Sequence, residues 1–315
     1  AFFSALAVPS AHANPTGGTV SAGQATISQN GTKLDVTQTS SKVVIDWRGF
    51  DIAPGEWTQF YQPSSSSIAL NRVNSTSASH IDGTLTANGN IVIINQNGIL
   101  FGAGAQVDVG ALIATTADIG NDAFMNSTGK LTFDLPGSPD ASIVNNGTIT
   151  AAQAGLVGLV APNVINNGVI TAKLGRVQLA SGDSFTLDLY GDGLINLQAS
   201  PAITQQLAEN SGTIAAGGGQ VLMTAAAAEN AVSSLVNLTG LVQANSVGEK
   251  NGEIVLYAQG ANGTALVSGQ ISASGKDSGE TGGSVSVLGN HVGLLTGSAI
   301  DRSEERRVGK ECRSR

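Results

Sequence analysis

The sequence predicts an all-β fold, a right-handed parallel β-helix (a solenoid) with an N-terminal cap. Three observations support this prediction: an internal repeat, glycines that precede short alternating strands, and a shortage of large side chains. The chain has 315 residues, of which 41 are Gly, only 8 are Pro and 4% are aromatic. Since 41% of the residues are hydrophobic, the chain is neither collagen-like nor disordered. Small aliphatic side chains must therefore fill the core, as in thin stacked β-structure.

The repeat is clearest where residues 143–151 recur as 164–172, with Gly147 and Gly168 offset by 21 positions. Its core is Gly-x-(Ile/Leu/Val)-x-Ala, in which the alternation predicts a strand with inward aliphatic and alanine side chains. The gaps between successive copies are 64, 21, 44, 28 and 29 residues, and several lie near one or two multiples of a 21-residue unit. The copies begin at Gly83, Gly147, Gly168, Gly212, Gly240 and Gly269.

A second glycine follows each copy and opens another alternating strand, as at 175–179 and 252–256. A third apolar segment often comes next, such as 185–189 or 265–267. Two or three such strands form one coil, and stacking coils about 4.8 Å apart pairs each strand with its neighbours above and below. Asn side chains can stack as hydrogen-bonded ladders between the coils. Residues 14–301 would then form roughly a dozen coils.

A β-sandwich or a propeller is the rival fold. Either would favour longer hairpins, and a WD-type propeller would show Trp signatures that this sequence lacks. The repeat therefore favours the β-helix.

Both ends differ from the repeat. Residues 1–13 are apolar and end in Ala11-His12-Ala13, which indicates the remainder of a secretory signal peptide. Residues 302–315 crowd charge into a chain that otherwise avoids it, and we interpret them as an extraneous tail. Between the ends we expect a specific N-terminal domain over 14–136 and continuing β-helix repeats over 137–301, with the native chain extending further.

Composition excludes several classes of function. The net charge of −8 disfavours nucleic-acid binding. Cys312 is the only cysteine, and the histidines at 12, 80 and 291 are too scattered for a metal cluster, so we expect neither a metal nor a cofactor. No apolar run reaches the 18 or so residues of a membrane-spanning helix.

Residues 14–125 carry more specific segments. They include 30–38, 43–52, 60–73, 79–89, 95–102 and 107–116. In these segments and their order, the chain resembles the N-terminal secretion (haemagglutination activity) domain of the filamentous haemagglutinin family, the exoproteins of bacterial two-partner secretion.

The resemblance implies a secretion domain of a large, adhesin-like exported protein. It would reach the periplasm through its signal peptide and be recognised by a dedicated outer-membrane β-barrel transporter. It would then cross that pore unfolded and fold as a β-helix at the cell surface or in the medium. Host-cell or surface receptors would bind a more C-terminal region.

The resemblance also indicates residues that the transporter could read. The family's Asn-Pro-Asn-Gly motif reads Asn95-Gln96-Asn97-Gly98 here, and no Asn-Pro-Asn-Leu is present. Asn97-Gly98 still predicts a tight turn, so these residues either shape a turn or are read by the transporter. The candidates for transporter recognition are Asn95, Gln96, Asn97, Gly98, Asn71 and Arg72.

Two further clusters have competing interpretations. The first, an aromatic cluster over 47–61, either closes the end of the rod or docks the transporter. The second, Asp183, Asp188 and Asp192, is the best enzyme candidate, yet Asp188 alternates with leucines and Asp192-Gly193 is a turn. We therefore predict no catalytic residue. The alternatives are an extracellular β-helical polysaccharide-active enzyme, or the carrier stalk of a C-terminal contact-dependent toxin.

Overall fold

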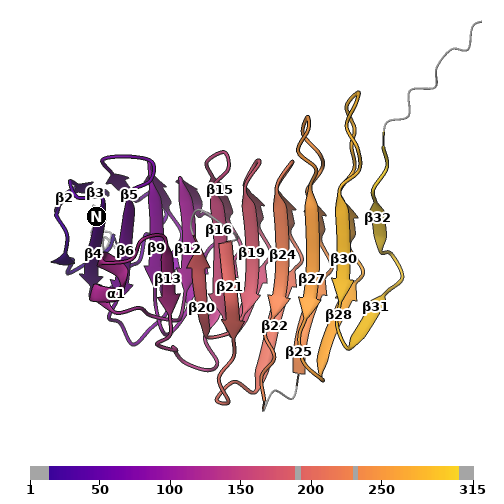
Figure 1. The fold of residues 1–315 in the computed structure, drawn as a ribbon. Coiled ribbons are helices and arrows are strands. Elements are labelled where there is room, and N and C mark those ends of the chain that lie inside the picture. The colour runs from indigo at the N-terminus through magenta and orange to yellow at the C-terminus, as the bar shows by residue number, and fades with distance from the viewer. Residues whose placement is uncertain (1–13, 189–192, 230–232, 305–315) are drawn as a thin grey trace, which may run out of the picture.

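The computed structural model describes residues 14–188, 193–229 and 233–304. Three long sheets, made almost entirely of parallel strands, wrap into a rod whose coils follow one another along its axis (Figure 1). One coil runs through a strand of each sheet in turn, as in β14, β15 and β16. The predicted parallel β-helix is confirmed.

Within each sheet, hydrogen-bonded neighbours follow one another along the rod. Sheet 1 has ten strands: β1 (Thr19–Ala22), β4 (Lys42–Trp47), β6 (Ile68–Val73), β9 (Asn90–Ile94), β12 (Ala111–Thr115), β16 (Leu156–Ala161), β19 (Arg176–Ser181), β24 (Gln220–Ala225), β27 (Glu253–Ala258) and β30 (Ser284–Leu288). Sheet 2 has eight: β7 (Ser79–Ile81), β10 (Ile99–Phe101), β14 (Ser142–Asn145), β17 (Asn163–Asn166), β22 (Gln205–Asn210), β25 (Ser233–Leu238), β28 (Gly263–Val267) and β31 (His291–Leu294). Sheet 3 has eleven: β2 (Ala25–Asn30), β3 (Lys33–Gln38), β5 (Trp57–Tyr61), β8 (Thr84–Ala87), β11 (Gln106–Val109), β15 (Thr148–Ala151), β18 (Val169–Thr171), β23 (Thr213–Ala215), β26 (Leu241–Gln243), β29 (Gln270–Ser272) and β32 (Ala299–Asp301).

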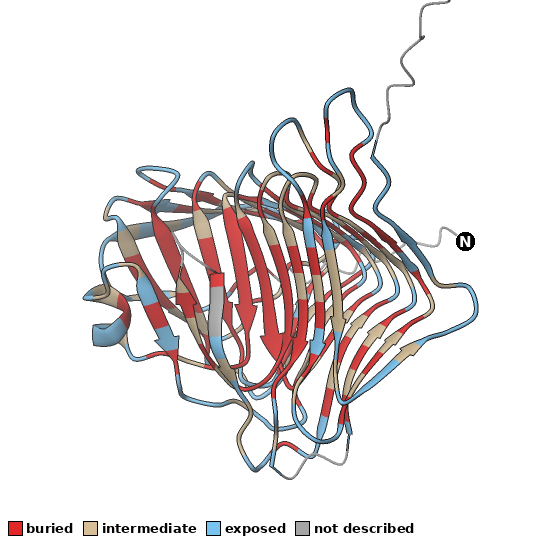
Figure 2. Cartoon of the chain, turned by 45° about the vertical axis from the view of Figure 1, so that its right-hand side comes forward, coloured by how far each residue is buried: buried red, intermediate tan, exposed pale blue. Residues whose placement is uncertain are grey.

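The repeat motif forms sheet 3 and faces the interior as predicted. Its aliphatic positions, among them Ile149, Ile170 and Ile214, are fully buried, and the alanines that follow are at most 5% exposed at 151, 172 and 216. Figure 2 shows that buried residues recur along the successive strands of the rod. The small alanine suits the narrow interior where the chain turns from sheet 3 into sheet 1.

The gap of 44 residues is one coil and not two 21-residue units, so that interpretation of the gap is wrong, and the gap of 64 residues spans two coils of unequal length. Val169 pairs in register with Thr213, so 44 residues form one coil that carries an excursion over 182–204. Likewise Thr84 pairs with Gln106 and Gln106 with Thr148, and the second of these coils carries an excursion over 116–141. The rod therefore has fewer coils than the repeat length suggested.

The two excursions pack together over the outer face of sheet 1. The first contains α1 (Asn121–Met125) and β13 (Lys130–Phe133), and the second contains β20 (Ser184–Asp188) and β21 (Gly193–Gln198). β20 pairs antiparallel with both β13 and β21, and the rings of Phe133 and Phe185 stack with centroids 4.6 Å apart. These side chains bury a second apolar cluster against sheet 1 that includes Val92 and Ile113.

The N-terminal end of the rod is closed by antiparallel strands. β1 pairs antiparallel with β4, and β2 pairs antiparallel with β3. The predicted cap is therefore present, but the aromatic cluster does not form it as a unit. Trp47, Phe50 and Phe60 are buried in the core of the first coils, whereas Trp57 and Tyr61 are 38% and 42% exposed.

Stacked asparagines join successive coils inside sheet 2, as predicted. Asn145 donates from Nδ2 to Oδ1 of Asn166 at 2.7 Å, and Asn166 donates to Asn210 at 2.6 Å. All three side chains are fully buried. A parallel exposed column runs beside them, in which Asn167 donates to Asn146 and accepts from Ser211.

Replacing the central buried asparagine should destabilise the rod. Asn166→Ala removes the acceptor of Asn145 and the donor of Asn210, leaving two buried polar groups without these partners. We expect the free energy of unfolding to fall by about 2–4 kcal/mol in urea titrations. Asn167→Ala is the matched control and should cost less than about 1 kcal/mol because its side chain is exposed. Equal losses for the two variants would contradict a stabilising role for the buried ladder.

Candidate transporter-recognition residues

The segment 95–98 forms the turn between β9 of sheet 1 and β10 of sheet 2. Asn95 is fully buried, and its Oδ1 accepts the Asn97 amide at 2.9 Å. Its Nδ2 donates to the Ser77 carbonyl and to Ser79 Oγ, both at 3.0 Å. Gly98 has a φ of +110°, which disfavours any residue with a Cβ. The predicted turn is therefore present, with Asn95 as its buried anchor.

The other two side chains of this turn are exposed and reach neighbouring coils. Asn97 Nδ2 donates to the Ser75 carbonyl at 2.8 Å, and Gln96 Nε2 donates to the Pro136 carbonyl at 3.2 Å. The Gln96 carbonyl also accepts the Ser138 amide at 2.9 Å. The turn thus connects the coil before it with the excursion that follows it.

Asn71 and Arg72 lie one strand away, on β6, and face opposite sides of sheet 1. Asn71 is fully buried in the interior, where it accepts from Trp47 Nε1 at 3.0 Å and donates to the Val92 carbonyl at 3.2 Å. Arg72 faces outward, toward the first excursion. Of the six candidates, Gln96 and Asn97 lie on the surface, Arg72 is half-buried, and Asn71, Asn95 and Gly98 are buried in the folded rod.

Arg72 fastens the first excursion to sheet 1. Its guanidinium donates to both carboxylate oxygens of Asp118, to Asp46, to Asn121 Oδ1 and to the Ile119 carbonyl, at 2.7–3.0 Å. Burial alone would lower the pKa of Arg72, but the hydrogen bonds and charges of Asp118 and Asp46 outweigh it and raise the pKa. The Arg72 side chain is therefore charged and half-buried, and it acts as a clamp that holds the first excursion against sheet 1.

Lys42 on β4 makes a second clamp, which the sequence analysis missed. Its Nζ donates to the carbonyls of Phe124 and Ser127 and to Ser127 Oγ, at 2.7–2.9 Å. These oxygens lie at the end of α1, where a cation complements the exposed carbonyls. Burial lowers the pKa of Lys42. Since the partners are more than 80 residues apart in sequence, no local pattern indicates the contact.

Other predicted candidates have structural partners. Lys33 Nζ lies 4.3 Å from the Trp57 ring centroid and donates to Tyr61 Oη at 3.0 Å, so the two exposed aromatics of the cluster are joined on sheet 3. Asp183 is 3% exposed and accepts the Ser200 amide at 2.9 Å, which holds the base of the second excursion. Asp188 alternates with buried neighbours on β20, as predicted, and Asp192 lies outside the described residues.

Comparison with known proteins identifies this arrangement. A family model described as "TPS secretion domain" matches residues 11–290. The chain belongs to the TPS secretion domain family. The matched residues include every coil described above up to β30, together with both excursions. Exoproteins with this domain are exported through the outer membrane to the cell surface or the medium, and the predicted two-partner secretion role is confirmed.

Two curated relatives and one solved structure agree with this assignment. Two heme/hemopexin-binding proteins of Haemophilus influenzae are 35% identical over 251 residues and 32% identical over 268 residues. Each match covers 78% of this chain but only 27% or 28% of the relative's own length. The crystal structure of the HMW1 secretion domain from Haemophilus influenzae superposes with a TM-score of 0.81 at 31% identity. That superposition covers 94% of this chain and 79% of the other.

Neither a metal cluster nor a spanning helix is present in the part of the chain that the structure describes. No group of three or more His, Cys, Asp or Glu residues is arranged to hold a metal ion among residues 14–188, 193–229 and 233–304. Across the same ranges, no helix is long and apolar enough to cross a membrane.

Removing the Arg72 clamp should loosen the first excursion of the TPS secretion domain. Arg72→Gln leaves Asp118 and Asp46 half-buried without their cation, so we expect a loss of about 2–3 kcal/mol in the free energy of unfolding. Hydrogen exchange should accelerate over residues 118–135 more than over sheet 3. Arg48→Gln, at an exposed arginine, is the control and should stay within about 0.5 kcal/mol. Unchanged exchange in the excursion of Arg72→Gln would contradict the clamp.

Proposed function

We propose that residues 14–136 are recognised by a dedicated outer-membrane transporter before they fold, and that the coils then stack outside the cell. The burial of Asn71 and Asn95 carries this proposal. If the transporter reads these two residues together with Gln96 and Asn97, it must do so while the segment is still extended, because the folded rod hides half of this set. The turn at 95–98 would then form only after recognition, when the segment folds.

The coil-by-coil arrangement supports folding that draws the chain outward. In sheets 1, 2 and 3 each parallel strand bonds to the strand of the preceding coil, as Leu156–Ala161 does with Ala111–Thr115. A solenoid of this kind releases free energy one coil at a time as chain becomes available. Progressive folding on the outside would bias passage through the pore without a nucleotide-driven step.

We also propose that the domain acts without catalysis. Asp183 of the acidic cluster is buried and accepts the Ser200 amide at the base of an excursion, which favours a structural role over an enzymatic one. For the whole exoprotein we propose an adhesin-like protein of the cell surface, whose receptor-binding part lies in its more C-terminal regions. Because the curated relatives are named for binding heme and hemopexin, these are the first ligands to test on that part.

A secretion assay tests the export role. Residues 14–315 would be expressed behind an intact signal peptide, with and without the transporter encoded beside the gene, and the medium would be probed by immunoblot. We expect release only when the transporter is present. Retention of folded protein in the periplasm in both strains would refute the proposal.

Variants separate recognition from folding in the same assay. Asn97→Ala removes an exposed amide and one hydrogen bond, so we expect it to reduce release by at least several-fold with little loss of stability. Asn167→Ala, an exposed asparagine of the repeat, is the control for recognition and should be released normally. Gly147→Ala would bring its Cβ within 2.6 Å of the Gly102 carbonyl oxygen. It should slow release in proportion to its loss of stability, and normal release despite a destabilised rod would argue against folding-driven export.

A further inference from the structure

A groove follows the edge of the rod where each coil turns from sheet 3 into sheet 1. Two cavities of about 510 and 290 Å³ lie along this edge and share the lining residues Ala154 and Arg176, so they form one continuous groove. It passes seven successive coils, from the turn at Ser65 to the start of β27 at Glu253. At about 4.8 Å per coil, its length is about 29 Å.

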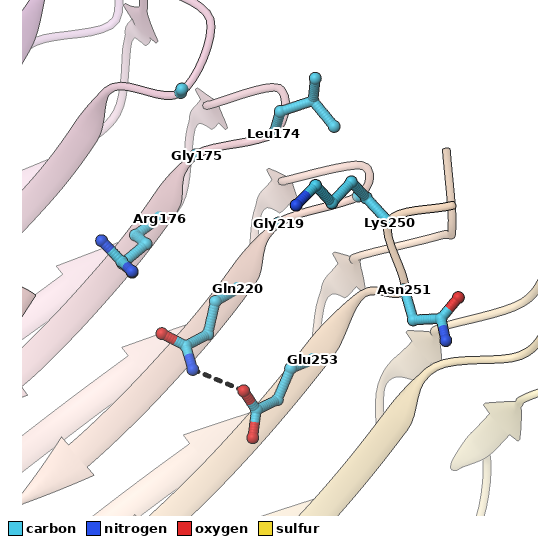
Figure 3. A pocket seen from close by; sticks show the side chains of 10 residues that line it. Leu174, Gly175, Arg176, Gly219, Gln220, Lys250, Asn251 and Glu253 are labelled. Atoms are coloured by element: carbon cyan, nitrogen blue, oxygen red, sulfur yellow. Dashed lines mark hydrogen bonds between the residues drawn. The ribbon is translucent and has the colours of Figure 1, made fainter. Parts of the chain in front are cut away.

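The floor of the groove is backbone because the stacking leaves no room for side chains there. A Cβ on Gly175 would lie 2.1 Å from the Gly155 carbonyl oxygen, and one on Gly219 would lie 2.0 Å from that of Gly175. The first residues of the sheet 1 strands from β9 to β27 form one wall. In Figure 3, Arg176, Gln220 and Glu253 stand one after another at the starts of β19, β24 and β27.

Two cations in this groove have no partner of their own. In the described part of the chain, the side chains of Arg176 and Lys250 make no hydrogen bond or ion pair, in contrast to those of Lys33, Lys42 and Arg72. Figure 3 shows Lys250 extending from its loop over Gly219. Glu253 is the acidic residue of the wall, and its carboxylate accepts Gln220 Nε2 at 2.5 Å. An anion in the groove would therefore meet two free cations.

We infer that this groove binds a linear polysaccharide that carries carboxylate or sulfate groups, with its anionic groups at Arg176 and Lys250. The groove is open along the rod, which suits an extended polymer rather than a compact ligand. Amide and hydroxyl side chains along the walls, such as Asn88, Asn90 and Ser65, can hydrogen-bond sugar hydroxyls. Nucleic acid fits less well, because none of the described residues that line the two cavities is an aromatic on which a base could stack.

Calorimetric titration of the full chain tests the inference. The probes are polygalacturonate oligomers, dextran sulfate, uncharged dextran and single-stranded DNA. We expect binding to the charged polymers that weakens as salt is raised, and none to uncharged dextran. Binding to polygalacturonate alone would assign carboxylate recognition, and binding to both charged polymers would assign recognition of charge. The double variant Arg176→Gln/Lys250→Gln should bind about tenfold more weakly or worse.

The matched control is Arg48→Gln/Lys276→Gln, which removes the same charge from exposed positions outside the groove and should bind normally. Both double variants should keep the wild-type melting temperature and normal export, so this outcome is independent of the secretion role. The inference is overturned if the two double variants bind alike or if the wild type binds none of the charged polymers. It is also overturned if uncharged dextran or single-stranded DNA binds as tightly as they do.

Discussion

In-register backbone hydrogen bonding between successive coils is the constraint on which this structure depends. It brings the chain of one coil so close to the next that the corners admit only glycine, as at Gly168, where a Cβ would lie 2.1 Å from the Gly147 carbonyl oxygen. The same register brings identical inward residues above one another. That is why asparagines can hydrogen-bond in a buried ladder and why isoleucine and alanine recur at fixed positions.

The two excursions are where the chain departs from this regularity. Their phenylalanine and leucine side chains cover the outer face of sheet 1. Without the excursions, the apolar side chains on that face would be exposed to solvent. Lys42 and Arg72 then fasten the first excursion to the coils that precede it. These contacts join segments 46–85 residues apart. In a chain that emerges from its N-terminus, the first coils can therefore be completed only after the excursion has followed them.

A rod built in this way divides into a tightly stacked interior and exposed edges and faces. Its interior is filled mainly by aliphatic side chains, with a few aromatic rings in the N-terminal coils. The glycine corners that stacking requires also leave a side-chain-free channel along the rod, and the residues beside it set its charge. Neighbouring positions are therefore under different constraints: a Cβ on Gly175 would clash with the backbone of the preceding coil, whereas the Arg176 side chain lines the groove.

The sequence by itself determined the coil: the alternating inward residues, the two glycine corners and the asparagine ladder all follow from a short local period. It also determined the family, through segments in the N-terminal part. Only the tertiary structure decided that a 44-residue gap is one coil with an excursion, that Asn71 and Asn95 are buried, and that the aromatic cluster divides between core and surface. The physical reason is that the period of a sequence repeat reports only local structure: which residues form a strand and which of them face inward. Excursion packing, the clamps at Lys42 and Arg72, and burial by later segments depend on contacts between distant residues that no period encodes.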